Sequence, residues 1–78
     1  MPMKNLIEYK RYQAELFVDA SESIIYGRVI NIERDIISFH ADTIEQAKAE
    51  FVEMIDEYLE ECAEDNVLPD QPKIMAAL

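Results

Sequence analysis

SFHADTIEQA, residues 38–47, marks the point where the chain changes from strand-like to helix-like periodicity. Up to this point, IISFHA (residues 36–41) alternates apolar and other side chains, the period of two of a half-buried strand. Beyond it, apolar residues recur at steps of three and four, the period of an amphipathic helix. Asp42 or Thr43 can cap that helix, because each is followed three residues later by a glutamate or glutamine. The stretch therefore predicts a strand-to-helix junction.

Two more strands are expected upstream of the junction. YQAELFVDA (residues 12–20) alternates apolar and polar residues, and IIYGRVINI (residues 24–32) is rich in β-branched and aromatic ones. The breaks between the three predicted strands, residues 21–23 and 33–35, are short. Short connections favour an antiparallel meander.

Downstream, we expect one long helix from Thr43 to about Glu64. Its apolar stripe, which should pack on the sheet, consists of Ile44, Ala47, Phe51, Met54, Ile55, Tyr58, Leu59 and Cys62. Asn66 can adopt the left-handed conformation that ends a helix, and the following PDQP segment should be extended. Residues 73–78 form a tail that either adds a strand or frays.

These elements predict an α+β domain, an antiparallel three- to four-stranded meander packed against one long helix. We assign residues 1–72 to this domain and residues 73–78 to the short tail. A chain of 78 residues, half of them hydrophobic, has room for one core.

The net charge of −10 comes from 17 acidic and 7 basic residues, and 11 of the acidic ones lie in residues 41–78. Nucleic acids and anionic membranes both need a cationic face, so neither is an expected partner. A basic protein is the natural complement. The N-terminus resembles no signal peptide and no stretch is long and apolar enough to span a bilayer, so we expect a cytoplasmic protein.

The only histidine, His40, lies two residues before Asp42, so a general acid–base pair is one interpretation. The other places His40 on the solvent face of a strand, with Asp42 at the helix cap. We favour the second interpretation, because no nucleophile motif and no second histidine accompanies His40. The sequence gives no reason to expect a catalytic residue, a bound metal or a cofactor.

Two further candidate sites have simple structural explanations. A carboxylate–metal nuclease site could involve Asp19, Asp42 and Glu45, but such sites need three or four converging oxygen ligands and nearby positive charge for the substrate. Cys62, the only cysteine, continues the apolar stripe, so we interpret it as core filler.

Acidic residues recur at four-residue spacing along the predicted helix, and each such pair should cost about 0.2–0.5 kcal/mol in an isolated helix. Several also lie near the helix C-terminus, where the macrodipole disfavours anions. One explanation is a solvated face that favours solubility, and the other is a docking surface whose repulsion a cationic partner relieves. We call this surface the glutamate face: Glu53, Glu57, Glu60, Glu61 and Glu64.

The order of several short motifs resembles the HicB family of bacterial antitoxins. These motifs are YKRY (residues 9–12), YGRV (26–29), DIISF (35–39), DTIE (42–45) and DEYL (56–59). The resemblance covers about residues 4–72. It implies an incomplete ribonuclease H-like fold without catalysis, which binds and masks a small basic toxin of the HicA family that cleaves messenger RNA.

The sequence departs from the family pattern at three places. Arg11 and Asn31 replace family glycines, which we expect to be mild local changes, and Ala41 stands where glycine is frequent. Relatives usually continue after the proline segment into a DNA-binding module, so operator binding is not carried over.

The expected function is therefore that of an antitoxin that neutralises a HicA-like toxin, with the glutamate face as the candidate contact. Pairing at an open sheet edge could also make the contact or form a homo-oligomer. The alternatives are a degenerate ribonuclease H-like nuclease around Asp19 and Asp42, and an interaction domain without a present partner.

Overall fold

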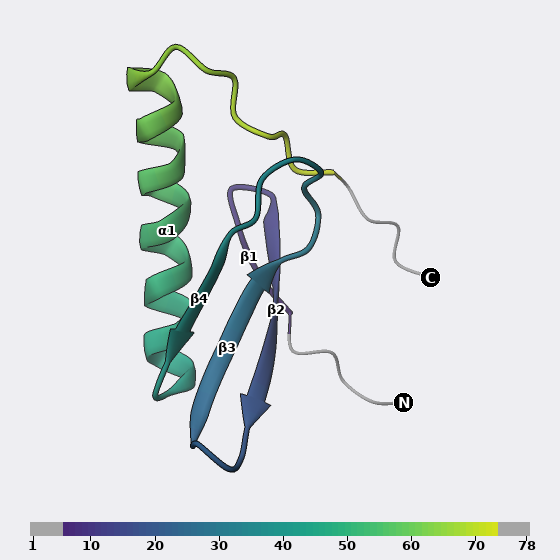
Figure 1. The fold of residues 1–78 in the computed structure, drawn as a ribbon, viewed down its shortest axis with the longest axis vertical. Helices are drawn as coiled ribbons and strands as arrows, with labels where there is room; N and C mark the ends of the chain where they lie inside the picture. Colours follow the sequence, from purple (N-terminus) through teal and green to yellow (C-terminus); the bar gives the residue numbers. More distant parts are fainter. Residues whose placement is uncertain (1–5, 74–78) are drawn as a thin grey trace.

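The computed structural model describes residues 6–73, which form one antiparallel sheet and one helix (Figure 1). The strands follow the chain in space, in the order β1 (Leu6–Tyr9), β2 (Tyr12–Asp19), β3 (Ile24–Val29) and β4 (Ser38–Ala41). The helix α1 (Ile44–Glu64) follows β4 directly. The predicted α+β meander against one long helix is therefore confirmed.

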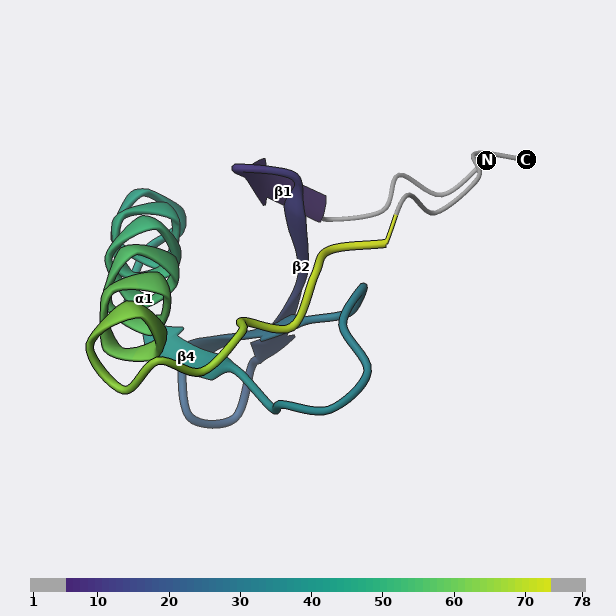
Figure 2. The same cartoon turned by 90° about the horizontal axis from the view of Figure 1, so that it is seen from above.

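The helix covers one face of the sheet and leaves the other face to solvent. Figure 2 shows α1 beside β4. At the opposite edge of the sheet, the β1–β2 hairpin curls back toward the helix. The core between the two layers consists of Tyr12, Ala14, Leu16, Ile25, Val29, Ile37, Phe39, Ala41, Ala47, Phe51 and Ile55. The middle of the predicted apolar stripe, from Ala47 to Leu59, faces this core, whereas Ile44 at its start is 45% exposed and Cys62 at its end lies outside the core cluster.

Gly27 lets the two layers approach closely. It pairs with Phe39 across β3 and β4, and a Cβ at position 27 would lie 2.1 Å from Cζ of that phenylalanine. The Phe39 ring therefore lies against the bare backbone of β3 and stacks on Phe51 of α1, with ring centroids 5.7 Å apart. Gly27, the only glycine of the sequence, is therefore a point of close packing.

The fourth strand is β1, at the N-terminal end of the described residues. The sequence left open either a strand or a frayed end for residues 73–78, and residues 74–78 lie outside the described part of the chain. Tyr9 pairs with Tyr12, so Lys10 and Arg11 form a two-residue turn, with φ values of 51° and 73°. Both values match a tight hairpin turn that usually contains asparagine and glycine. Because Lys and Arg occupy these two positions instead, the sequence does not indicate the turn.

Two predicted strands are shorter than expected, because residues 30–37 form a loop between β3 and β4. Its middle is fixed by Asp70, whose carboxylate Oδ2 accepts hydrogen bonds from three consecutive backbone N–H groups, those of Glu33, Arg34 and Asp35. This arrangement of successive N–H groups around one anion is a backbone nest. A residue about 35 positions away therefore ends the strands, which explains why a three-residue break was the wrong prediction.

The segment after the helix, residues 66–73, runs across the end of the sheet, and we call it the C-terminal strap (Figure 1). Asn31 holds its far end: the side-chain amide donates to the carbonyls of Lys73 and Arg11, and Oδ1 accepts from the Gln13 N–H, each at 2.9 Å. Asn31 is 3% exposed. The prediction that Asn31 is a mild local change is therefore wrong, because its side chain joins β2, the loop and the strap.

Both ends of α1 are capped as its sequence allows. Oγ1 of Thr43 accepts from the Gln46 N–H at 3.1 Å, and the Gln46 side chain accepts from the Asp42 N–H, so Thr43 and not Asp42 is the cap. At the other end Asn66 is left-handed with φ of 55°, and the Val67 N–H donates to the Cys62 carbonyl, as in a Schellman motif. Within residues 6–73, no helix has the length and apolar character needed to span a membrane.

Candidate interaction surfaces

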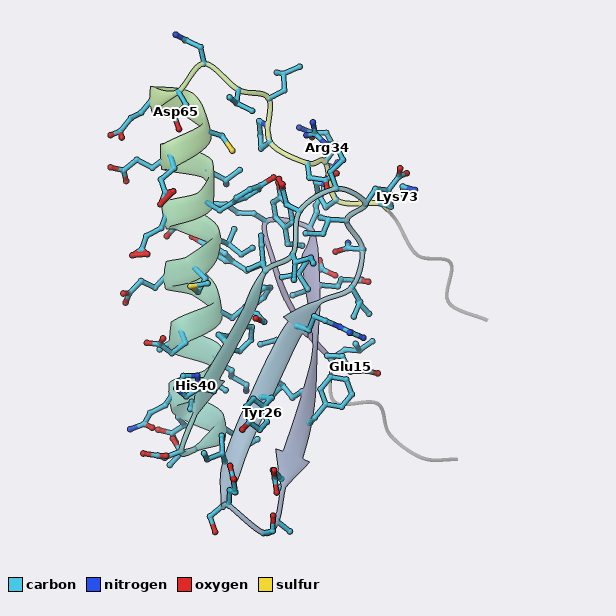
Figure 3. All side chains as sticks on the ribbon, in the orientation of Figure 1. Glu15, Tyr26, Arg34, His40, Asp65 and Lys73 are labelled. Atoms are coloured by element: carbon cyan, nitrogen blue, oxygen red, sulfur yellow. The ribbon has the colours of Figure 1, made fainter. Side chains whose placement is uncertain are left out.

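All five residues of the glutamate face are exposed and lie on one side of α1. At 3.6 residues per turn, their positions fall within an arc of about 100°, away from the buried side chains of the helix. Figure 3 shows carboxylate side chains projecting from α1 on the side away from the sheet. The ion pairs within the described residues are Lys10–Asp56 and Lys73–Glu33, so none involves this face. The structure therefore brings the five predicted residues together on one uncompensated surface.

Asp56 has a different environment from the glutamates. Its carboxylate accepts hydrogen bonds from Lys10 Nζ at 2.9 Å and from the Tyr9 hydroxyl at 3.0 and 3.1 Å. The hydrogen bond from Lys10 is the main cause that lowers the pKa of Asp56, with the bond from Tyr9 next, and together they outweigh the opposing effect of desolvation. Asp56 therefore anchors the β1–β2 hairpin to α1 and is not part of the repelling surface.

No hydrogen bond of the described residues joins His40 to Asp42, although both line one open hollow at the start of α1. His40 is exposed on the face of the sheet that α1 leaves open, where its ring lies 6.4 Å from that of Tyr26 (Figure 3). Among the hydrogen bonds of the described residues, none involves the imidazole of His40 or the carboxylate of Asp42. The junction interpretation agrees with this geometry.

Among the carboxylates suggested for a nuclease site, Asp19 is engaged in a turn of its own. Asp19 closes the turn after β2, since its Oδ1 accepts from the Ser21 hydroxyl, the Ser21 N–H and the Glu22 N–H. The Ser21 hydroxyl is the main cause that lowers the pKa of Asp19. Across residues 6–73 no three histidine, cysteine, aspartate or glutamate side chains converge to hold a metal ion. Cys62, interpreted as core filler, is only half-buried, and it is neither in the buried core of the described residues nor among the side chains packed against that core.

A row of exposed rings crosses the open face of the sheet, and the sequence analysis missed it. Phe17, Tyr26 and His40 are cross-strand neighbours on β2, β3 and β4, and they line a shallow depression of about 390 Å³ with Arg28 and Ser38. Phe17 is 44% exposed. The sequence could have indicated this row through Phe17, because the alternation in β2 places this aromatic residue on the same side as the polar Gln13, Glu15 and Asp19.

A second hollow lies at the border of the glutamate face. It measures about 210 Å³ and lies between the loop and α1. We call it the Ile36 notch: Ile36, Ile37, Met54, Glu57, Tyr58 and Glu61. Ile36 is 87% exposed, the highest value among the large apolar side chains of the described residues. The sequence analysis missed this notch because it placed Ile36 in a strand.

Tyr58 connects the notch to the strap. Its hydroxyl donates to Asp35 Oδ2 and accepts from the Asp70 N–H at 2.6 Å. Desolvation, followed by the hydrogen bond to Asp35, raises the pKa of Tyr58 well above its ordinary range, so this hydroxyl keeps its proton at neutral pH. The loop, the helix and the strap therefore meet at one hydroxyl group.

Comparison of the chain with protein-family models, with curated proteins and with solved structures finds no match to any of them.

Proposed function

We propose that this chain is an antitoxin, which binds and neutralises a small, basic, messenger-RNA-cleaving toxin of the HicA type and has no catalytic activity of its own. The observation that carries the proposal is the glutamate face, five exposed carboxylates on one side of α1 without an ion pair in the described residues. A cationic protein surface is the partner that such a face fits best.

The energetics of the helix support a functional reason for these glutamates. Glu53 and Glu57, Glu57 and Glu61, and Glu60 and Glu64 are like-charge neighbours one turn apart, and each pair costs the isolated helix about 0.2–0.5 kcal/mol. The last turn of α1 contains no basic residue that would offset the macrodipole. A docked lysine- or arginine-rich partner would remove these costs, and the same field would accelerate encounter.

The resemblance to HicB supports the same function independently of charge. Its motifs are spread over most of the chain and imply a toxin-binding domain, which accords with a compact α+β fold of this size. A toxin that cleaves messenger RNA places the complex in the cytoplasm.

β1 and β4 are the two edge strands of the sheet, and we propose pairing at one of these edges as the route to a homo-oligomer.

Co-expression with a small basic protein of the HicA type tests the proposal. We expect the two proteins to co-purify and the toxin to cleave messenger RNA only when this chain is absent. A toxin that neither binds this chain nor loses activity in its presence would contradict the proposal. Magnesium-dependent cleavage of RNA by this chain alone would instead support the nuclease alternative.

Two variants matched in charge test the part played by the glutamate face. Replacement of Glu53, Glu60 and Glu64 by glutamine should weaken toxin binding about tenfold or more at low salt and flatten its salt dependence. The control replaces Glu8, Glu22 and Glu45, three exposed glutamates outside the face, by glutamine. Equal effects of the two variants would show that only net charge matters and that the face is not a specific contact.

A further inference from the structure

The Ile36 notch combines an apolar centre with an acidic border. Ile36 and Met54 supply the apolar side chains, while Glu57 and Glu61 belong to the glutamate face and line the same hollow. Protein interfaces concentrate their binding energy in a few apolar anchors that a polar rim shields from water. The notch has both parts in one place.

The backbone on either side of Ile36 is held firmly. The preceding residue, Asp35, donates its N–H to Asp70 Oδ2 at 3.0 Å and accepts a hydrogen bond from the Tyr58 hydroxyl. The following residue, Ile37, is buried, and its carbonyl accepts from the Val29 N–H at 2.9 Å. The 87% exposed side chain of Ile36 therefore projects from a fixed loop.

Such an exposed isoleucine has no function in the stability of the isolated chain. Burial of an apolar side chain of this size is worth about 1.5–3 kcal/mol, and at 87% exposure Ile36 has gained little of it. Because the backbone on both sides of Ile36 is already held, a partner that covers the side chain has only the rotamers of that side chain left to fix. The geometry is that of a preformed anchor for a binding partner.

We propose that the Ile36 notch is the central contact of the interface with the basic toxin, with Ile36 entering an apolar pocket of the toxin and Glu57 and Glu61 pairing with lysine or arginine at the rim of that pocket. Charge complementarity selects this occupant, because a second copy of this chain would bring acidic side chains against Glu57 and Glu61. The inference rests on the proposed antitoxin function and names the surface that performs it.

Toxin affinity of three variants, measured by calorimetry with the full chain, tests the notch. Ile36→Ser should weaken binding about tenfold or more, mainly through faster dissociation. Leu68→Ser is the matched control, because Leu68 is 81% exposed but lies on the strap outside the notch, and it should leave affinity unchanged. The double variant E57Q/E61Q should weaken binding and reduce its salt dependence. Circular dichroism and thermal melting establish that all three variants are folded.

The outcomes separate this inference from the proposed function. If the wild-type chain binds the toxin and Ile36→Ser binds as tightly as Leu68→Ser, the notch is not the central contact, although the antitoxin function stands. If the wild-type chain binds no toxin, the proposed function and the inference are both overturned. Loss of affinity confined to Ile36→Ser and E57Q/E61Q supports both.

Discussion

Arg11 occupies a backbone conformation that suits glycine better than any other residue. Its φ of 73° lies in the left-handed region, where a side chain costs about 1–2 kcal/mol. Lys10 shares the turn and has φ of 51°, but its ammonium group gains the ion pair with Asp56. The side chain of Arg11 is exposed and forms no ion pair within the described residues. The strain at Arg11 is therefore uncompensated.

Arg11→Gly should therefore stabilise the protein by up to about 1 kcal/mol, because the relief of strain exceeds the extra freedom that glycine gives the unfolded chain. Urea denaturation monitored by circular dichroism measures the change. Lys10→Gly is the comparison variant and should stabilise the protein less than Arg11→Gly, since the relief of strain at its φ of 51° is offset by loss of the Lys10–Asp56 ion pair and of the packing of the lysine on Tyr9. A decrease in stability for Arg11→Gly would show that Arg11 makes a favourable contact.

At the scale of the elements, periodicity was enough to predict the helix and three of the four strands. The core-facing positions of β2 and α1 repeat with clear periods of two and 3.6, and local periodicity is the strongest signal in a single sequence. β1 was missed because its turn, Lys10-Arg11, has none of the usual hairpin residues. The early end of β3 was missed because a distant carboxylate, that of Asp70, competes for the loop backbone.

The helix should become more stable when its acidic C-terminal half loses charge. Replacement of Glu60 and Glu64 by glutamine removes two like-charge pairs at four-residue spacing, Asp56/Glu60 and Glu60/Glu64, and two anions near the negative end of the macrodipole, so we expect a gain of about 0.5–1 kcal/mol at low salt. Thermal melting at two ionic strengths measures this gain, which salt should reduce.

Glu45→Gln is the control for this prediction, because Glu45 lies in the first turn of α1, where the macrodipole favours an anion. It should lower stability slightly. If Glu60→Gln/Glu64→Gln and Glu45→Gln shift the melting temperature in the same direction, helix electrostatics is not the cause. A more stable double variant that binds toxin less tightly would indicate that the glutamates serve binding at the expense of stability.

At the scale of the whole molecule, Asp70 joins three separate segments. Its carboxylate binds the loop, its N–H binds Tyr58 of α1, and its carbonyl accepts from the Tyr12 hydroxyl of β2 at 2.7 Å. Desolvation raises the pKa of the Asp70 carboxyl, but the N–H groups of Asp35 and Arg34 and the charge of Arg34 outweigh it, so the net pKa is lowered. The charged form of Asp70 therefore favours the folded state.

A lowered pKa in the folded state means that Asp70 contributes stability above its unfolded pKa of about 3.9, and that this contribution is lost as pH falls toward the folded pKa. We expect the urea midpoint of the wild-type chain to fall on acidification below about pH 5. Asp70→Asn should lower the midpoint at pH 7 and reduce its dependence on pH, because the group that titrates is gone.

Hydrogen exchange gives the structural control for this prediction. Asp70→Asn should speed exchange of the N–H groups of Glu33, Arg34 and Asp35 while β2 and β3 keep their protection. Asp42→Asn, at an exposed carboxylate outside this network, should change neither the pH dependence of the urea midpoint nor the exchange of these N–H groups. If the urea midpoints of the wild-type chain and of Asp70→Asn fall in parallel as pH is lowered, Asp70 is not the group responsible for the acid sensitivity.

The candidate surfaces were predictable to different degrees. The glutamate face was found because helical spacing alone places its members on one side of α1. The Ile36 notch could not be found, since its two borders come from the loop and the helix, and the loop takes its shape from the strap. Asn31 shows the same limit: a buried side chain that bonds to β2 and Lys73 is recognised only when these segments are seen together.

The contact between Gly27 and the ring of Phe39 also restricts how this sequence can change over time. Any side chain at position 27 would displace Phe39, and Phe39 carries the stack on Phe51, so a substitution would need a second change elsewhere before it could be tolerated. Positions 27 and 39 are therefore expected to vary as a pair or not at all, whereas the neighbouring Tyr26 and Arg28, which point away from the core, are not subject to this packing constraint.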